Sequence, residues 1–105
     1  MLGKIDFAEF GTVKDRGFLM GLILYFSAGG CGVGDLCSYT ANISKECKWE
    51  NKDRKETFTQ IFDDIYGILT DAKVNYVSEL VGKPVEITIG EDNRLKSFRI
   101  LTEVL

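Results

Sequence analysis

The chain begins with alternating apolar and polar positions. Over residues 4–10 (KIDFAEF), Ile5 and Phe7 fall on one side and Asp6 on the other, which is the period of a half-buried strand. A nine-residue apolar run, FLMGLILYF (residues 18–26), follows a turn-like Lys-Asp-Arg-Gly sequence. Such a run is typical of a strand that is buried on both faces or lies centrally in a sheet. Together the two segments predict an antiparallel hairpin.

A glycine-rich segment, SAGGCGVGDLC (residues 27–37), directly follows the apolar run. Glycine adopts positive φ readily and allows sharp turns or close backbone approach. We therefore expect a wide turn or bulge that leads the chain back into the sheet, where residues 37–43 predict a short third strand. A contact surface held by the sheet is a second role for this segment. A phosphate-binding loop is a third, although the segment fails the Gly-x-Gly-x-x-Gly pattern and no helix pattern follows it.

The clearest helical pattern lies between residues 54 and 71. Apolar residues recur there at spacings of three and four, while polar residues face the other way. The positions that we expect to be buried against strand residues such as Leu22 and Leu24 are Phe58, Phe62, Ile65 and Leu69. On this basis, Phe62→Ala would cost about 3–5 kcal/mol.

The C-terminal third predicts a short helical turn and a hairpin. Asn75 is expected to cap the turn and Gly82 to end it. Residues 85–89 then alternate apolar and polar, residues 90–93 form a turn, and residues 95–101 return. The order predicts one α+β domain, residues 1–105, in which an antiparallel sheet of about five strands packs on one long helix in two layers. The sheet's other face is only partly polar, which favours self-association into a homo-oligomer.

Composition and charge narrow the function. Hydrophobic residues make up 45% and charged residues 28% of the chain, as in ordinary globular proteins. The net charge of -3 argues against direct nucleic-acid binding, which needs a basic surface. The longest apolar run has nine residues, whereas a membrane helix needs about 20, and no targeting segment is visible. We therefore expect a cytoplasmic protein without membrane contact.

The absence of histidine removes most familiar catalytic machinery. Neither a Ser-His-Asp nor a Cys-His arrangement can be built from this sequence. The three cysteines, Cys31, Cys37 and Cys47, lack a close pair and a histidine partner, so we expect neither a zinc site nor any other metal site. No cofactor motif is present, and we expect no enzyme activity. A minor enzyme that uses Cys31 or Cys37 as nucleophile with a carboxylate partner stays open as a third hypothesis.

The order of segments resembles a family of proteins. The apolar strand GFLMGLILYF runs into GGCGVGDLCSY, and after a helix the block VNYVSELVGKPVEITIGEDNRLKSFRIL closes the chain, with Leu80, Gly82 and Lys83 at its centre. This order is similar to a recurrent family of small, mostly uncharacterised bacteriophage proteins. The resemblance implies an accessory protein in the cytoplasm of an infected bacterium. It also implies action by binding, as in anti-CRISPR inhibitors of host defence or in proteins that sequester signalling nucleotides.

Two binding hypotheses follow. The leading one is a non-catalytic accessory protein that binds and inhibits a host defence protein or protein complex. Its candidate contact residues combine the glycine segment with the polar connection at residues 45–55, which carries five basic and three acidic residues. They are Gly29, Gly30, Gly32, Val33, Gly34, Asp35, Lys48 and Trp49. The alternative is an oligomer that encloses a phosphorylated signalling nucleotide between the glycine segment and basic residues such as Lys14, Arg16, Lys48 or Arg54.

Overall fold

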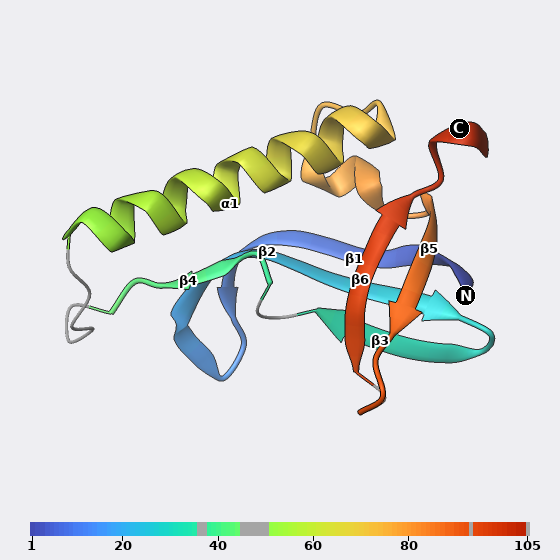
Figure 1. Cartoon of the computed structure of the whole chain (residues 1–105), viewed down its shortest axis with the longest axis horizontal. Helices are drawn as coiled ribbons and strands as arrows, with labels where there is room; N and C mark the ends of the chain where they lie inside the picture. The colour runs from blue at the N-terminus through green and yellow to red at the C-terminus, as the bar shows by residue number, and fades with distance from the viewer. Residues whose placement is uncertain (36–37, 45–50, 93, 105) are drawn as a thin grey trace.

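A computed structural model describes residues 1–35, 38–44, 51–92 and 94–104 of the chain. Within these residues six strands form one antiparallel sheet, and a long helix covers one of its faces (Figure 1). The two-layer α+β prediction is confirmed, with six strands in place of about five. The elements in chain order are β1 (Leu2–Val13), β2 (Arg16–Ala28), β3 (Cys31–Asp35), β4 (Thr40–Asn42), α1 (Asn51–Ala72), η1 (Val77–Leu80), β5 (Pro84–Ile89), β6 (Leu95–Ile100) and η2 (Thr102–Val104).

The β1–β2 hairpin forms the centre of the sheet. The strand order is β3-β2-β1-β5-β6, and β4 pairs with β2 outside this path. β1 pairs with β2 along most of its length, whereas it pairs with β5 only over residues 2–4. The chain turns between β1 and β2 at Asp15, which has a φ of 65°, close to the predicted turn. The long apolar run is therefore a central strand, as its composition predicts.

The sixth strand is the glycine segment itself. Residues 31–35, which we expected in a turn or bulge, pair with β2 from Cys31 opposite Ala28 to Asp35 opposite Leu24. The turn before them is short because Gly29 and Gly30 both have positive φ, 58° and 81°, which suits a two-residue hairpin. The predicted third strand at residues 37–43 is present as β4, at residues 40–42.

The core lies between α1 and the sheet. Leu22, Leu24 and Phe26 of β2 are almost completely buried, because they alternate onto the face that α1 covers. β5 and β6 also contribute to this core, and the ring centroids of Phe26 in β2 and Phe98 in β6 lie 4.8 Å apart. Leu80 of η1 is also fully buried. The Glu79 carboxylate accepts a hydrogen bond from the Tyr76 backbone nitrogen at 3.0 Å, so η1 is capped one residue later than predicted.

The predicted burial of Phe62 is wrong. Its side chain is 66% exposed, whereas Ile61 and Ile65 are each 8% exposed. With 100° between successive residues, the buried stripe of α1 is centred near Ile61 and Ile65, and Phe62 falls on its edge. Phe58 and Leu69, which share that edge, are partly buried. The predicted helical period is correct, whereas the centre of the buried face lies at Ile61 and Ile65 and not at Phe62.

Candidate protein-contact surface

The face of the sheet opposite α1 carries two exposed aromatic side chains. Phe7 of β1 and Tyr25 of β2 are 42% and 43% exposed. They lie directly opposite each other in the strand pairing, and their rings meet edge to face with centroids 5.4 Å apart. Tyr25 points away from α1 because its neighbours Leu24 and Phe26 point into the core. This face therefore presents a paired aromatic surface.

Gly34 of β3 makes room for the Tyr25 ring. The two residues are opposite each other in the β2–β3 pairing. A Cβ at position 34 would lie 2.9 Å from a ring carbon of Tyr25, so the ring rests on glycine backbone. Phe7, Tyr25 and Gly34 thus form one row across three strands. We name these three residues, with Ile23, the aromatic face.

A hollow of about 370 Å³ adjoins the aromatic face. Phe7, Ile23, Tyr25 and neighbouring residues of β1 line it, and the ionisable residues Glu9 and Lys14 belong to its lining. Ile23 is almost buried. Aromatic residues are enriched in the centres of protein–protein interfaces, and the surrounding rims are polar. The composition of this surface matches that pattern.

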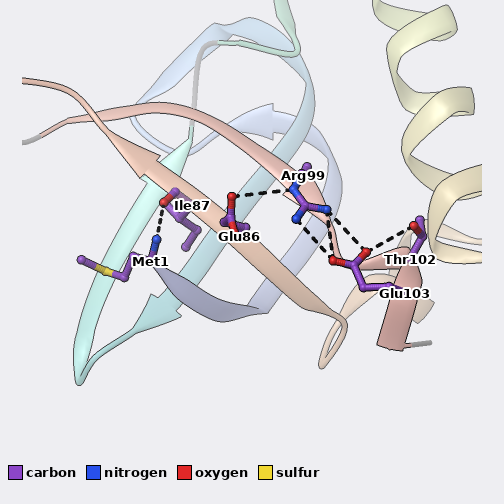
Figure 2. Close-up of polar contacts among 6 residues, drawn as sticks. All are labelled: Met1, Glu86, Ile87, Arg99, Thr102 and Glu103. Atoms are coloured by element: carbon purple, nitrogen blue, oxygen red, sulfur yellow. Dashed lines mark hydrogen bonds and ion pairs between the residues drawn. The ribbon is translucent and has the colours of Figure 1, made fainter.

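A cluster of charges lies on β5, β6 and η2 (Figure 2). Arg99 faces Glu86 across the strands, with its Nε 3.7 Å from a carboxylate oxygen, and donates hydrogen bonds of 3.3 Å to Glu103. The hydrogen bond from Arg99 to Glu103 raises the pKa of the guanidinium. The pKa of the Glu103 carboxyl is lowered, first by a backbone hydrogen bond of its own residue and then by Arg99. Because these groups are exposed, the cluster adds little stability and provides a polar border to the sheet.

The predicted contact residues of the glycine segment fall into three environments. Gly29 and Gly30 form the exposed β2–β3 turn, and Gly32 is exposed within β3. Val33 is partly buried and packs against the core, opposite Phe26. Gly34 belongs to the aromatic face, and Asp35 ends β3. The other two predicted contact residues, Lys48 and Trp49, lie outside the described residues.

Comparison with protein-family models, with curated proteins and with solved structures finds no match to this chain.

Sequence reasoning missed Phe7 and Tyr25 as surface residues. Alternation placed Ile5 and Phe7 on one side, but the pairing register shifts between them, so the extra residue, Asp6, puts Phe7 on the opposite face. Tyr25 sits in an unbroken apolar run, which contains no polar position to distinguish the two faces. The one available signal was Gly34, because a glycine in a strand often marks a close approach.

The basic residues of the nucleotide hypothesis do not converge on the glycine turn. Lys14 and Arg16 lie at one end of β2, and the Gly29–Gly30 turn lies at the other. β2 has 13 residues, which at about 3.3 Å per residue separates its ends by roughly 40 Å. The Arg54 guanidinium donates to the Ile43 carbonyl oxygen at 3.3 Å and lies 5.4 Å from the centre of the Phe58 ring. Among the described residues, Lys14, Arg16 and Arg54 therefore do not form the predicted phosphate-binding cluster with this turn.

The thiol and metal predictions concern residues that are only partly described. Cys31 is an exposed free thiol at the start of β3, whereas Cys37 and Cys47 lie outside the described residues. Residues 1–35, 38–44, 51–92 and 94–104 contain no group of three or more Cys, Asp or Glu side chains that could hold a metal ion. No helix in the same ranges is long and apolar enough to cross a membrane.

The glycines of the β2–β3 hairpin differ in what they tolerate. Gly30→Ala is expected to destabilise the fold by about 1 kcal/mol, because φ is 81° there and a Cβ disfavours that conformation. Gly32→Ala is the matched control. Its φ is not positive and the nearest atom to a new Cβ is 3.9 Å away, so little change is expected. Thermal unfolding of both variants checks this, and equal melting temperatures would show that the turn does not depend on positive φ at residue 30.

Proposed function

We propose that this chain is a non-catalytic binding module whose contact surface for a protein partner is the aromatic face. The observation that carries the proposal is the Phe7–Tyr25 pair, in which two adjacent rings stay more than two-fifths exposed on the sheet face opposite α1. Removing apolar area of this kind from water stabilises a complex. The Phe7–Tyr25 contact also holds each ring in place, so binding costs little additional side-chain entropy.

The polar groups around the aromatic face support a protein partner that binds reversibly. Glu9 and Lys14 belong to the lining of the hollow beside the aromatic face. Non-obligate interfaces combine an apolar centre with charged edges of this kind, which steer encounter and keep the free protein soluble.

The resemblance to small bacteriophage proteins supports a bacterial defence component as the partner. A module of this size inhibits such a component by covering the surface with which it acts. The mechanism needs shape and contact only, and it calls for no nucleophile, metal or cofactor in this chain.

Affinity capture with matched variants tests the proposal. The tagged chain is used to recover proteins from a bacterial lysate that contains defence systems, and the affinity of each recovered protein is then measured. The double variant Phe7→Ala/Tyr25→Ala is expected to weaken binding of the specific partner at least about 30-fold, because paired aromatic residues at an interface centre act as hot spots. Tyr76→Ala is the control, since Tyr76 is 70% exposed and lies on η1, and it is expected to bind like the wild type.

Two results would contradict the proposal. One is full affinity of the double variant for the same partner, with its melting temperature near that of the wild type. The other is recovery of no specific protein while heating releases a ligand that absorbs at 260 nm from the purified chain, which would favour the nucleotide hypothesis.

A further inference from the structure

A second hollow lies on the α1 side of the sheet, beyond the buried core. It has a volume of about 240 Å³ and is lined by residues of α1, β1, β2 and β4 and by Ile43, which follows β4. Figure 1 shows α1 passing above β4 at this end of the molecule. All of its lining residues are apolar. We name five of them the helix-side groove: Phe10, Met20, Ile43, Phe58 and Phe62.

Large apolar side chains are exposed in and beside this groove. Phe10 is 45%, Met20 37% and Phe62 66% exposed. Two more lie next to them: Phe18, whose carbonyl accepts the Ile43 backbone N–H at 2.8 Å, and Tyr66, one helical turn after Phe62. A large side chain of this kind has about 200 Å² of surface. At the exposed fractions given above and those of Phe18 and Tyr66, the exposed area of Phe10, Phe18, Met20, Phe62 and Tyr66 is roughly 500 Å². A standard interface takes about 800 Å² from each partner, so the groove region supplies most of one.

We propose that a second copy of this chain covers the helix-side groove in a two-fold symmetric dimer, with Phe62 of each copy inserted into the groove of the other. A two-fold interface brings the same surface of both copies together, so this surface must be complementary to itself, and a projecting group beside a recess meets that condition. Phe62 projects at the edge of a recess of about 240 Å³. That volume equals about eight water molecules at roughly 30 Å³ each, enough for a phenyl ring.

The composition of the groove favours a second copy over a different protein. Its lining residues are all uncharged, and the nearest described charge is the Arg54 guanidinium, which lies over the Phe58 ring and donates to the Ile43 carbonyl oxygen. By contrast, Glu9 and Lys14 belong to the lining of the hollow beside the aromatic face. Homodimer interfaces are more apolar than interfaces between proteins that also exist apart. The two surfaces therefore have different occupants, and the dimer stands independently of the proposed function.

Light scattering after size-exclusion chromatography tests the dimer over a range of protein concentrations. The wild-type chain is expected to elute with twice its chain mass of 11.8 kDa. Phe62→Glu is expected to weaken the dimer at least about 100-fold, because it places a charge in an apolar recess at two symmetric positions. Tyr76→Glu is the matched control, since Tyr76 is about as exposed as Phe62 but lies on η1, and it is expected to stay dimeric.

A variant on the opposite wall of the groove tests whether the recess, and not only the Phe62 side chain, is needed for the dimer. Met20→Glu is expected to dissociate the dimer as Phe62→Glu does, and circular dichroism checks that both variants stay folded. A wild-type chain that is monomeric at all concentrations would overturn the proposal. So would a dimer that persists in folded Phe62→Glu or folded Met20→Glu. Phe7→Ala/Tyr25→Ala is expected to leave the mass unchanged, so failure of the dimer and failure of partner binding are distinguishable.

Discussion

Phe26→Ala is expected to lower the free energy of unfolding by about 3–5 kcal/mol, the range for removing a buried aromatic ring from a core. Phe26 is 1% exposed, lies opposite both Ile5 and Val33 in the strand pairing, and touches the Phe98 ring. Its loss leaves a cavity where β1, β2, β3 and β6 meet. Because the total free energy of unfolding of a small domain is about 5–15 kcal/mol, the variant should be partly unfolded at moderate temperature. Urea denaturation followed by circular dichroism measures the change.

Phe62→Ala is the control for this prediction, and its expected effect is at most about 0.5–1 kcal/mol. The ring is 66% exposed, so truncation removes little buried area and leaves no closed cavity. Both variants must be compared at concentrations where the chain is monomeric, because dimerisation through Phe62 adds stability that depends on concentration. If Phe62→Ala cost as much as Phe26→Ala under those conditions, the placement of α1 would be wrong.

The sequence allowed correct prediction of those elements whose periodicity is unambiguous. β5 alternates apolar and polar residues, and its burial alternates in step, with Val85 and Ile87 buried and Glu86 and Thr88 more exposed. η1 ends at Leu80, and Gly82, with a φ of 89°, follows its C-cap Val81, close to the predicted end. In these cases a local pattern determines the local structure, and the sheet and helix that they form follow from packing one apolar face on another.

The features that were missed depend on contacts between distant segments. Phe7 lies on the aromatic face because of the bulge after Ile5. Tyr25 lies there because of its position in the alternation of β2, where the apolar run contains no polar residue that marks the exposed face. Phe62 lies on the edge of a helical stripe whose centre depends on how α1 sits on the sheet. Consequently, the predicted site centred on the glycine segment, whereas the exposed aromatic surface lies mainly on the two strands before it. Gly34 is the residue that the two share.

The two proposed interfaces use opposite faces of one hairpin. β1 and β2 contribute Phe7 and Tyr25 to the aromatic face, and Phe10 and Met20 to the helix-side groove. A dimer formed through the groove leaves the Phe7 and Tyr25 rings uncovered, because they point away from α1, although Phe10 belongs to the lining of both hollows. Such a dimer can engage two partner molecules, or two sites on one assembly with higher effective affinity. In this proposed assembly, one hairpin would carry both the dimer contact and the partner contact.

Gly21→Ala is expected to destabilise the fold by about 3 kcal/mol or more, at the upper end of overpacking effects. Gly21 lies opposite Thr40 in the β2–β4 pairing, and a Cβ there would collide with the Tyr39 carbonyl oxygen and come within 2.8 Å of the Thr40 Cα. These are backbone atoms, and the Tyr39 oxygen also accepts the Leu22 N–H at 3.0 Å. No side-chain rotation can relieve the collision, so β4 must move away from β2.

Gly11→Ala is the matched control for that substitution. Gly11 lies directly opposite Gly21 in the β1–β2 pairing, but a Cβ at residue 11 would meet no atom within 4 Å. Its melting temperature is therefore expected to stay near that of the wild type. Amide hydrogen exchange locates the damage in Gly21→Ala: the Leu22 and Ile43 amides, whose hydrogen bonds link β2 to the β4 segment, should exchange faster than amides of β5. Equal melting temperatures for the two variants would mean that β4 does not press on β2 at Gly21.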